Sequence, residues 1–151
     1  MSTIAELMTH DHRACDHDFA RAETLAAKGD WSGAADALDA FARALNAHFD
    51  AEEQHLFPAF EAATGMTHGP THVMRGEHRD MRDALERLQA ALRAQDGDDF
   101  AGEAETLLIM MQQHNMKEEN MLYPMCEAHL ARVQDELCTL LSQALAAEHT
   151  A

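Results

Sequence analysis

The chain has 151 residues, and its 27 aspartates and glutamates outnumber its 11 lysines and arginines, which gives a formal net charge of −16. This length suits a single domain, residues 1–151, and so strong a negative charge repels phosphate backbones, so that binding to nucleic acid is not expected. No apolar run reaches the roughly 18 residues that a transmembrane helix needs, so no membrane association is expected. What the composition leaves to be explained is the presence of eleven histidines in an acidic chain.

The cysteines and the first residues favour a reducing compartment. Cys15, Cys126 and Cys138 form no CxxC motif, and three thiols cannot all pair with one another. Residues 1–13 lack the basic and then apolar order of a secretory signal peptide. We therefore expect a cytoplasmic protein.

The chain is predicted to be all-α. Glycine and proline are sparse, and the stretches between them are rich in Ala, Leu, Glu, Arg and Met, which are good helix formers. Thr3 and Glu6 have the spacing of a capping box at the start of the first helix, and Gly29 is a typical stop at its end. The predicted long helices cover residues 3–28, 32–63, 71–94 and 100–123, with a turn at 95–99.

Two prolines and the C-terminal segment modify this pattern. Pro58 and Pro124 are expected to bend or interrupt the second and fourth helices, because proline lacks the N–H that a helix interior needs. After them, leucines at helical spacing predict a fifth, accessory helix over residues 127–148. This amphipathic helix can dock on its own bundle or support a homodimer, and the sequence does not decide between the two.

Each long helix has an apolar seam at steps of three and four residues, and each seam is interrupted by a histidine. Four such helices with short connections predict an antiparallel up-down-up-down four-helix bundle, with its core at residues 3–126. The seams would then face the bundle axis. The polar residues on them are His12, His48, His78 and His114, together with Glu52 and Glu118.

An internal repeat with an offset of 66 residues links the two halves of the chain. The segment from His48 to Pro58 recurs from His114 to Pro124, and both follow the pattern H-x3-E-E-x2-L-(F/Y)-P. An earlier (D/E)-H-R element, at residues 11–13, recurs at 77–79. Each half is therefore predicted to be one helical hairpin, and a pseudo-twofold axis should relate the two.

Helix geometry predicts that the four histidines lie at one level. Each lies 14 or 16 residues from the expected turn of its hairpin, which is about 21–24 Å at about 1.5 Å per residue. Glu52 and Glu118 follow His48 and His114 by one helical turn and share their faces. Four histidines and two glutamates should therefore converge inside the bundle.

This residue set predicts a metal centre. Two ionised carboxylates buried close together are strongly unfavourable unless cations offset their charge. Mixed nitrogen and oxygen ligands suit iron, manganese or zinc, and six ligands exceed the number that one tetrahedral zinc uses. Two carboxylates that can bridge, with two histidines at each end, favour a dinuclear centre.

The repeated motif resembles the hemerythrin-like, or HHE cation-binding, family over roughly residues 4–125. The resemblance implies a non-haem centre of two iron ions with an oxo or hydroxo bridge, in which both glutamates also bridge. It implies the metal ligands His12, His48, Glu52, His78, His114 and Glu118. Proteins of this family handle small oxidants, namely O2, NO or peroxide.

Two departures favour one branch of that family. Met74 stands where oxygen-carrying hemerythrins have a fifth histidine, and H-x3-E at His114 replaces their H-x4-D. The chain therefore looks more like the repair-of-iron-centres branch, although it lacks the cysteine-bearing N-terminal domain of many such proteins. With one histidine fewer, a symmetric site would leave an exchangeable position on both metals.

The expected function is therefore binding of, or reaction with, NO, O2 or peroxide in a stress or redox context. The alternatives are a non-enzymatic iron donor or store, an O2 or redox sensor, and a metal that is mainly structural. Whether the protein is an enzyme stays open at this point. The roles of Cys15, Glu53, His55, Glu119 and Tyr123 also stay open.

Overall fold

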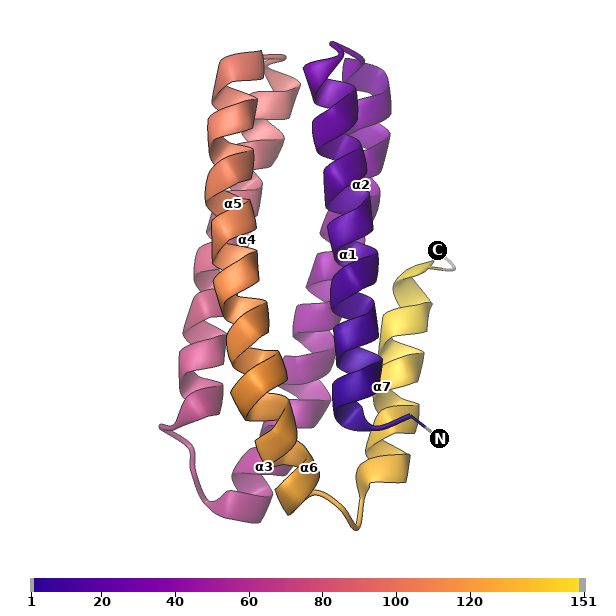
Figure 1. Ribbon diagram of the computed structural model, residues 1–151, viewed down its shortest axis with the longest axis vertical. Coiled ribbons are helices and arrows are strands. Elements are labelled where there is room, and N and C mark those ends of the chain that lie inside the picture. The colour runs from indigo at the N-terminus through magenta and orange to yellow at the C-terminus, as the bar shows by residue number, and fades with distance from the viewer. Residues whose placement is uncertain (1, 150–151) are drawn as a thin grey trace.

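The computed structural model describes residues 2–149, with side chains through residue 146, and the regular elements in that range are all helical. The long helices are α1 (Ile4–Ala27), α2 (Trp31–Ala51), α4 (Pro70–Arg93) and α5 (Gly97–Lys117). Figure 1 shows them side by side, with the short turns α1–α2 and α4–α5 at the same end of the molecule. The all-helical bundle predicted from the sequence is confirmed.

Side-chain caps fix where the helices begin. The Thr3 hydroxyl accepts a hydrogen bond from the backbone N–H of Glu6, which confirms the predicted start of α1. At the other hairpin, the Asp96 carboxylate caps α5 by accepting from the N–H of Asp99. This helix therefore starts at Gly97, and the predicted turn at 95–99 is wrong at its C-terminal side, because an aspartate in that turn is the cap of the next helix.

Both α-helices are interrupted near their prolines, as predicted, although each helical rod continues. The rod that begins with α2 passes through a π-helical turn, η1 (Glu52–Leu56), into α3 (Phe57–Thr64). The second rod repeats this with η2 (Glu118–Leu122) and α6 (Tyr123–His129). The π-helical turns lie directly before the prolines, which fall at the start of the next α segment, where a missing N–H costs little.

The accessory helix starts later than predicted. The segment 127–129 completes α6, which ends with Leu130 in a non-helical conformation, and α7 (Gln134–His149) begins after a turn. The predicted start at 127 is therefore wrong, because leucine spacing does not reveal the turn. Three of the leucines of α7 are buried against the same chain: Leu137, Leu141 and Leu145. Its Gln134 side chain also accepts from the backbone N–H of Ile4, at the start of α1.

The buried interior has two apolar clusters with a polar layer between them. One cluster fills the end that holds the α1–α2 turn and includes Phe19, Phe41 and Leu88. The other lies toward α3, α6 and α7 and includes Phe57 and Phe60. The four seam histidines and two seam glutamates lie between these clusters, all buried. Over the described residues, no helix has both the length and the apolar character needed to cross a membrane.

Candidate metal centre

The structure brings together all six residues that the sequence singled out. The four long helices α1, α2, α4 and α5 supply one histidine each, and the two π-helical turns supply the glutamates. All six are at most 4 % exposed. Their side-chain atoms form two groups that could hold a metal, His12–His48–Glu118 and Glu52–His78–His114–Glu118, each spanning no more than 4.8 Å.

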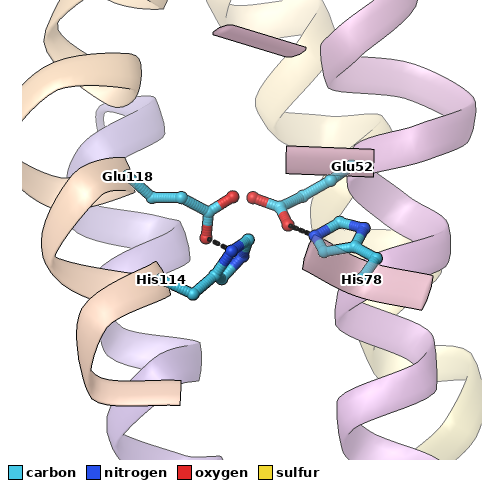
Figure 2. A group of neighbouring side chains, drawn as sticks. All are labelled: Glu52, His78, His114 and Glu118. Atoms are coloured by element: carbon cyan, nitrogen blue, oxygen red, sulfur yellow. Dashed lines mark ion pairs between the residues drawn. The ribbon is translucent and has the colours of Figure 1, made fainter. Parts of the chain in front are cut away.

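The carboxylates of Glu52 and Glu118 face one another across the middle of the bundle, as Figure 2 shows. His78 Nε2 lies 3.1 Å from Glu52 Oε1, and His114 Nε2 lies 3.3 Å from Glu118 Oε1. On the other side of the pair, His12 Nε2 lies 3.0 Å from Glu118 Oε1, and His48 Nε2 lies 3.6 Å from Glu52 Oε1. Each histidine therefore points Nε2 toward the carboxylate pair.

In each of these four histidines, the other ring nitrogen, Nδ1, is hydrogen-bonded to a carboxylate farther from the centre, called here an outer carboxylate. Asp11 accepts from His48 Nδ1 at 2.7 Å, and Glu53 accepts from His78 Nδ1 at 2.6 Å. The remaining two contacts are their repeat equivalents, Glu77 with His114 at 2.8 Å and Glu119 with His12 at 2.7 Å. Because an ionised carboxylate only accepts, Nδ1 donates to it, and Nε2 is the ring atom that would bind a metal.

From the sequence, Glu53 and Glu119 can be either solvent-exposed residues or outer-sphere partners of the histidines. Asp11 and Glu77 are not identified as outer-sphere partners from the sequence. The signal that could have found the latter pair is the repeated (D/E)-H-R element, in which the acidic residue adjoins one histidine and binds another. Two cations support these carboxylates: Arg82 bonds to Glu53 at 2.8 Å, and Lys117 bonds to Glu77 at 2.5 Å. Burial raises the pKa of the Glu53 carboxyl, but hydrogen bonds from His78 and Arg82 prevail and hold that pKa at about 2.

The charges of the buried histidines and glutamates shift the pKa values of several of these residues. Burial lowers the pKa of His114, but the Glu118 carboxylate prevails and raises that pKa to about 9. For His48, burial again lowers the pKa, and the charge of Glu52 raises it well above its ordinary value. Burial raises the pKa of Glu118, and the positive charge of His114 brings it well below its usual range. The buried carboxylates thus depend on positive charge nearby.

Four buried atoms on one side of the cluster have no hydrogen-bond partner among the described residues: Glu52 Oε1, His78 Nε2, His114 Nε2 and Glu118 Oε2. Some of these atoms lie close to an oppositely charged group, as His78 Nε2 does to Glu52 Oε1, but the angles are not those of a hydrogen bond. An unpaired buried polar atom costs about 1–3 kcal/mol. A cation coordinated by these four atoms would satisfy all of them at once, so the residues present fit a bound metal.

Aromatic rings close the cluster. Phe49 stacks on His78 with ring centroids 4.0 Å apart, and Phe57 stacks on the same imidazole at 5.6 Å. On the opposite side, Tyr123 stacks on His12 at 5.7 Å and its hydroxyl donates to Glu52 Oε2 at 2.8 Å. Burial, with the charges of the two glutamates, raises the pKa of this phenol well above its ordinary value.

Two residues with open roles remain, His55 and Cys15. His55 is half-buried and lines a shallow pocket together with Glu136 and Leu140. Cys15 is buried one turn from His12, and burial is the main reason that the pKa of its thiol rises to about 12. Its protonated thiol donates a long hydrogen bond, 4.0 Å, to Asp11 Oδ2, so this residue packs against an outer carboxylate as a thiol and not as a thiolate.

A helical bundle with histidines and carboxylates converging at its centre is the architecture of metal-binding bundle proteins. The family model described as the hemerythrin HHE cation binding domain matches residues 3–126, and the chain belongs to that family. Comparisons with curated proteins and with solved structures gave no match. Cation binding is thus the property that the family and the buried histidine and glutamate groups share.

Proposed function

We propose that this protein holds two iron ions and that the resulting centre binds or reacts with NO, O2 or peroxide. One ion is assigned to His12 and His48 and the other to His78 and His114, with Glu52 and Glu118 shared between them. The observation that carries the proposal is the set of four unpartnered buried atoms beside the paired glutamates. The two imidazole pairs on opposite sides of these glutamates favour two ions over one.

The donor set favours iron. Four imidazole nitrogens and the oxygens of two carboxylates form a mixed nitrogen and oxygen environment that suits iron and manganese and offers more ligands than tetrahedral zinc uses. Four outer carboxylates orient the imidazoles, so little rearrangement is needed when metal enters. Bound iron would supply redox chemistry and open coordination positions for a small ligand, while the surrounding residues supply orientation and a dry environment.

The surroundings favour a ligand of few atoms. Phe49 and Phe57 are fully buried on one side of the centre, and Tyr123 is fully buried on the other. A cavity of about 110 Å³ between α4 and α5 extends to His114 and is bordered by Glu77 and Lys117. A diatomic molecule or peroxide fits a volume of this size.

Three further assignments belong to this proposal. The bundle is assigned antiparallel up-down-up-down order as one domain, and the protein is assigned to the cytoplasm, which its three unpaired cysteines support. The chain is assigned to the repair-of-iron-centres branch. Met74 supports that branch, because it is a buried apolar residue where oxygen carriers have a histidine. An iron donor or a sensor is the second candidate function, since the same centre could bind without turnover.

The test is anaerobic loading with Fe(II), followed by metal analysis and an absorption spectrum. We expect two irons per chain and, after oxidation, the charge-transfer bands of a bridged di-iron centre. The His78→Ala variant should lose at least one iron, while His55→Ala, which removes a half-buried histidine outside the centre, should keep both. One zinc per chain, or equal iron content in both variants, would refute the assignment.

Ligand addition separates the candidate functions. Turnover of peroxide or NO by the iron-loaded protein would support an enzyme, whereas stoichiometric binding would support a sensor or carrier. Transfer of iron to apo iron–sulfur acceptors would support a donor. A stable and reversible O2 complex without turnover would count against reaction with oxidants as the function.

A further inference from the structure

The pseudo-twofold symmetry of the centre is broken at one ring. Residue 57 is phenylalanine, and its repeat equivalent, residue 123, is tyrosine. The two rings occupy matching positions, since Phe57 stacks on His78 and Tyr123 stacks on His12 with the same interplanar angle of 25°. The two sides of the centre therefore differ by this hydroxyl group, and also by Phe49, which stacks on His78 and whose repeat equivalent is Asn115.

That hydroxyl is surrounded by four of the atoms proposed to bind metal. The Tyr123 oxygen lies 2.8 Å from Glu52 Oε2 and 2.9 Å from Glu118 Oε1. It lies 3.2 Å from His12 Nε2 and 3.3 Å from His48 Nε2. These nitrogens are the pair assigned to one of the two metal ions.

The distances match those between neighbouring ligands of an octahedral ion. When ligand atoms lie about 2.1 Å from a metal, adjacent ligands are about 3 Å apart and opposite ligands about 4.2 Å apart. The phenol oxygen is about 3 Å from all four atoms, as an apical ligand is from its basal neighbours. In the base, His12 Nε2 lies 3.0 Å from Glu118 Oε1, as neighbours do, and His48 Nε2 lies 3.9 Å from it, close to an opposite pair.

The other side of the centre has no such group. Its Nε2 atoms, on His78 and His114, are among the four buried atoms without a partner, and the Phe57 ring offers them no polar atom. The cavity between α4 and α5 also extends to His114 on this side. The two metal positions therefore differ in the number of polar protein atoms around them.

We propose that the Tyr123 oxygen is a fifth protein ligand to the metal held by His12 and His48, so that small molecules bind at the metal held by His78 and His114. This inference rests on the proposed function, because it requires two bound metals. Tyrosine oxygen is an established iron ligand in proteins. As the metal enters, the O–H bond is replaced by an O–metal bond and the proton is released to solvent, with no change of oxidation state. The symmetric site expected from the sequence, with an exchangeable position on both metals, is thereby replaced by a one-sided site.

The experiment uses the intact protein loaded with two irons and oxidised to the ferric state. A bound phenolate gives a visible charge-transfer band and tyrosine ring modes in resonance Raman spectra excited in that band. We expect both in the wild-type protein and neither in Tyr123→Phe, which places at residue 123 the ring that the repeat already uses at residue 57. The matched variant Phe57→Tyr should strengthen the band, because its hydroxyl would meet the second pair of imidazoles.

An azide titration of the ferric protein gives an independent readout. Wild type should bind one azide per centre, and Tyr123→Phe should bind two, because removing the phenol frees a position on the second iron. Two irons without the tyrosine ring modes, or the same azide stoichiometry in both proteins, would overturn the inference and leave the di-iron proposal standing. Fewer than two irons in the wild type would instead refute the proposed function.

Discussion

The outer carboxylate Glu53 allows a quantitative test of how the centre is preorganised. Its Oε2 atom accepts from His78 Nδ1 at 2.6 Å and from Arg82 Nη1 at 2.8 Å, with 23 % of the side chain exposed. Glu53→Gln keeps an acceptor for the imidazole but removes the charge, and hydrogen bonds to charged groups exceed neutral ones by about 1 kcal/mol. This part-exposed site should realise less than the full difference, so we expect a loss of about two- to fivefold in metal affinity.

Removing the acceptor altogether should cost more. In Glu53→Ala the His78 Nδ1–H loses its partner and the ring loses its fixed orientation, and loss of an outer-sphere partner weakens metal binding about 10–100-fold. Arg82 should stay in place in both variants, because it also bonds to Asn46 and Asp50.

The assay is a competition titration with a chelator of known affinity, in parallel with a urea melt of the metal-free protein. The matched control is Glu103→Gln, which also removes a carboxylate paired with an arginine, Arg87, but lies away from the histidines. It should bind metal as the wild type does. If Glu53→Ala retained wild-type affinity, or if Glu103→Gln lost as much, the orienting role of Glu53 would be wrong.

Three further outcomes are expected. Leu141→Ala should lower the free energy of unfolding by about 2–5 kcal/mol in urea melts, because the Leu141 side chain is fully buried. The control Leu140→Ala, at a position 45 % exposed, should change this free energy by less than about 0.5 kcal/mol. Equal losses in the two variants would show that α7 does not dock as described. A maleimide reagent should label Cys138 in the folded protein and should reach Cys15 and Cys126 only after denaturation. Cys15 and Cys126 are buried, and burial raises the pKa of each of these two thiols to about 12. Rapid labelling of all three cysteines in the folded protein would contradict this expectation. Chelating the metal from the loaded protein should lower Tm in calorimetry, because the paired inner glutamates lose their compensating cations; an unchanged Tm would exclude linkage between metal and fold.

The repeat and the helical spacing were sufficient to predict the convergence of the six inner residues. A histidine on each seam can be placed along its helix to within a turn, because the rise per residue is constant. The position of Glu52 one turn after His48 then follows from helix periodicity alone. The regular part of the fold could therefore be predicted from residue types and their separations.

The parts that could not be predicted depend on events that residue spacing does not encode. The Asp96 cap and the turn after Leu130 shift helix starts, because a single side chain or backbone conformation decides them. The pairing of Asp11 with His48 joins two helices, and its partner cannot be chosen from one helix alone. The role of the Tyr123 hydroxyl depends on distances to four other side chains, which only a three-dimensional structure provides.

The π-helical turn η1 accommodates one extra residue after Glu52 and so decides which side chains face the core below the metal centre. In an uninterrupted α-helix, the seam that includes Glu52 would continue through His55 and Ala59, yet the residues that the structure buries are Leu56 and Phe60. The extra residue in the turn shifts the inward face by about 100°, one residue of helical rotation. Deleting one residue from this turn would restore a regular α-helix and place Leu56 and Phe60 at the seam positions that follow Glu52, so the ligand and the aromatic floor would both stay inward. An insertion would instead add a second extra residue and rotate these side chains away from the core, so insertions here should be tolerated far less than in the turns at the opposite end of the bundle.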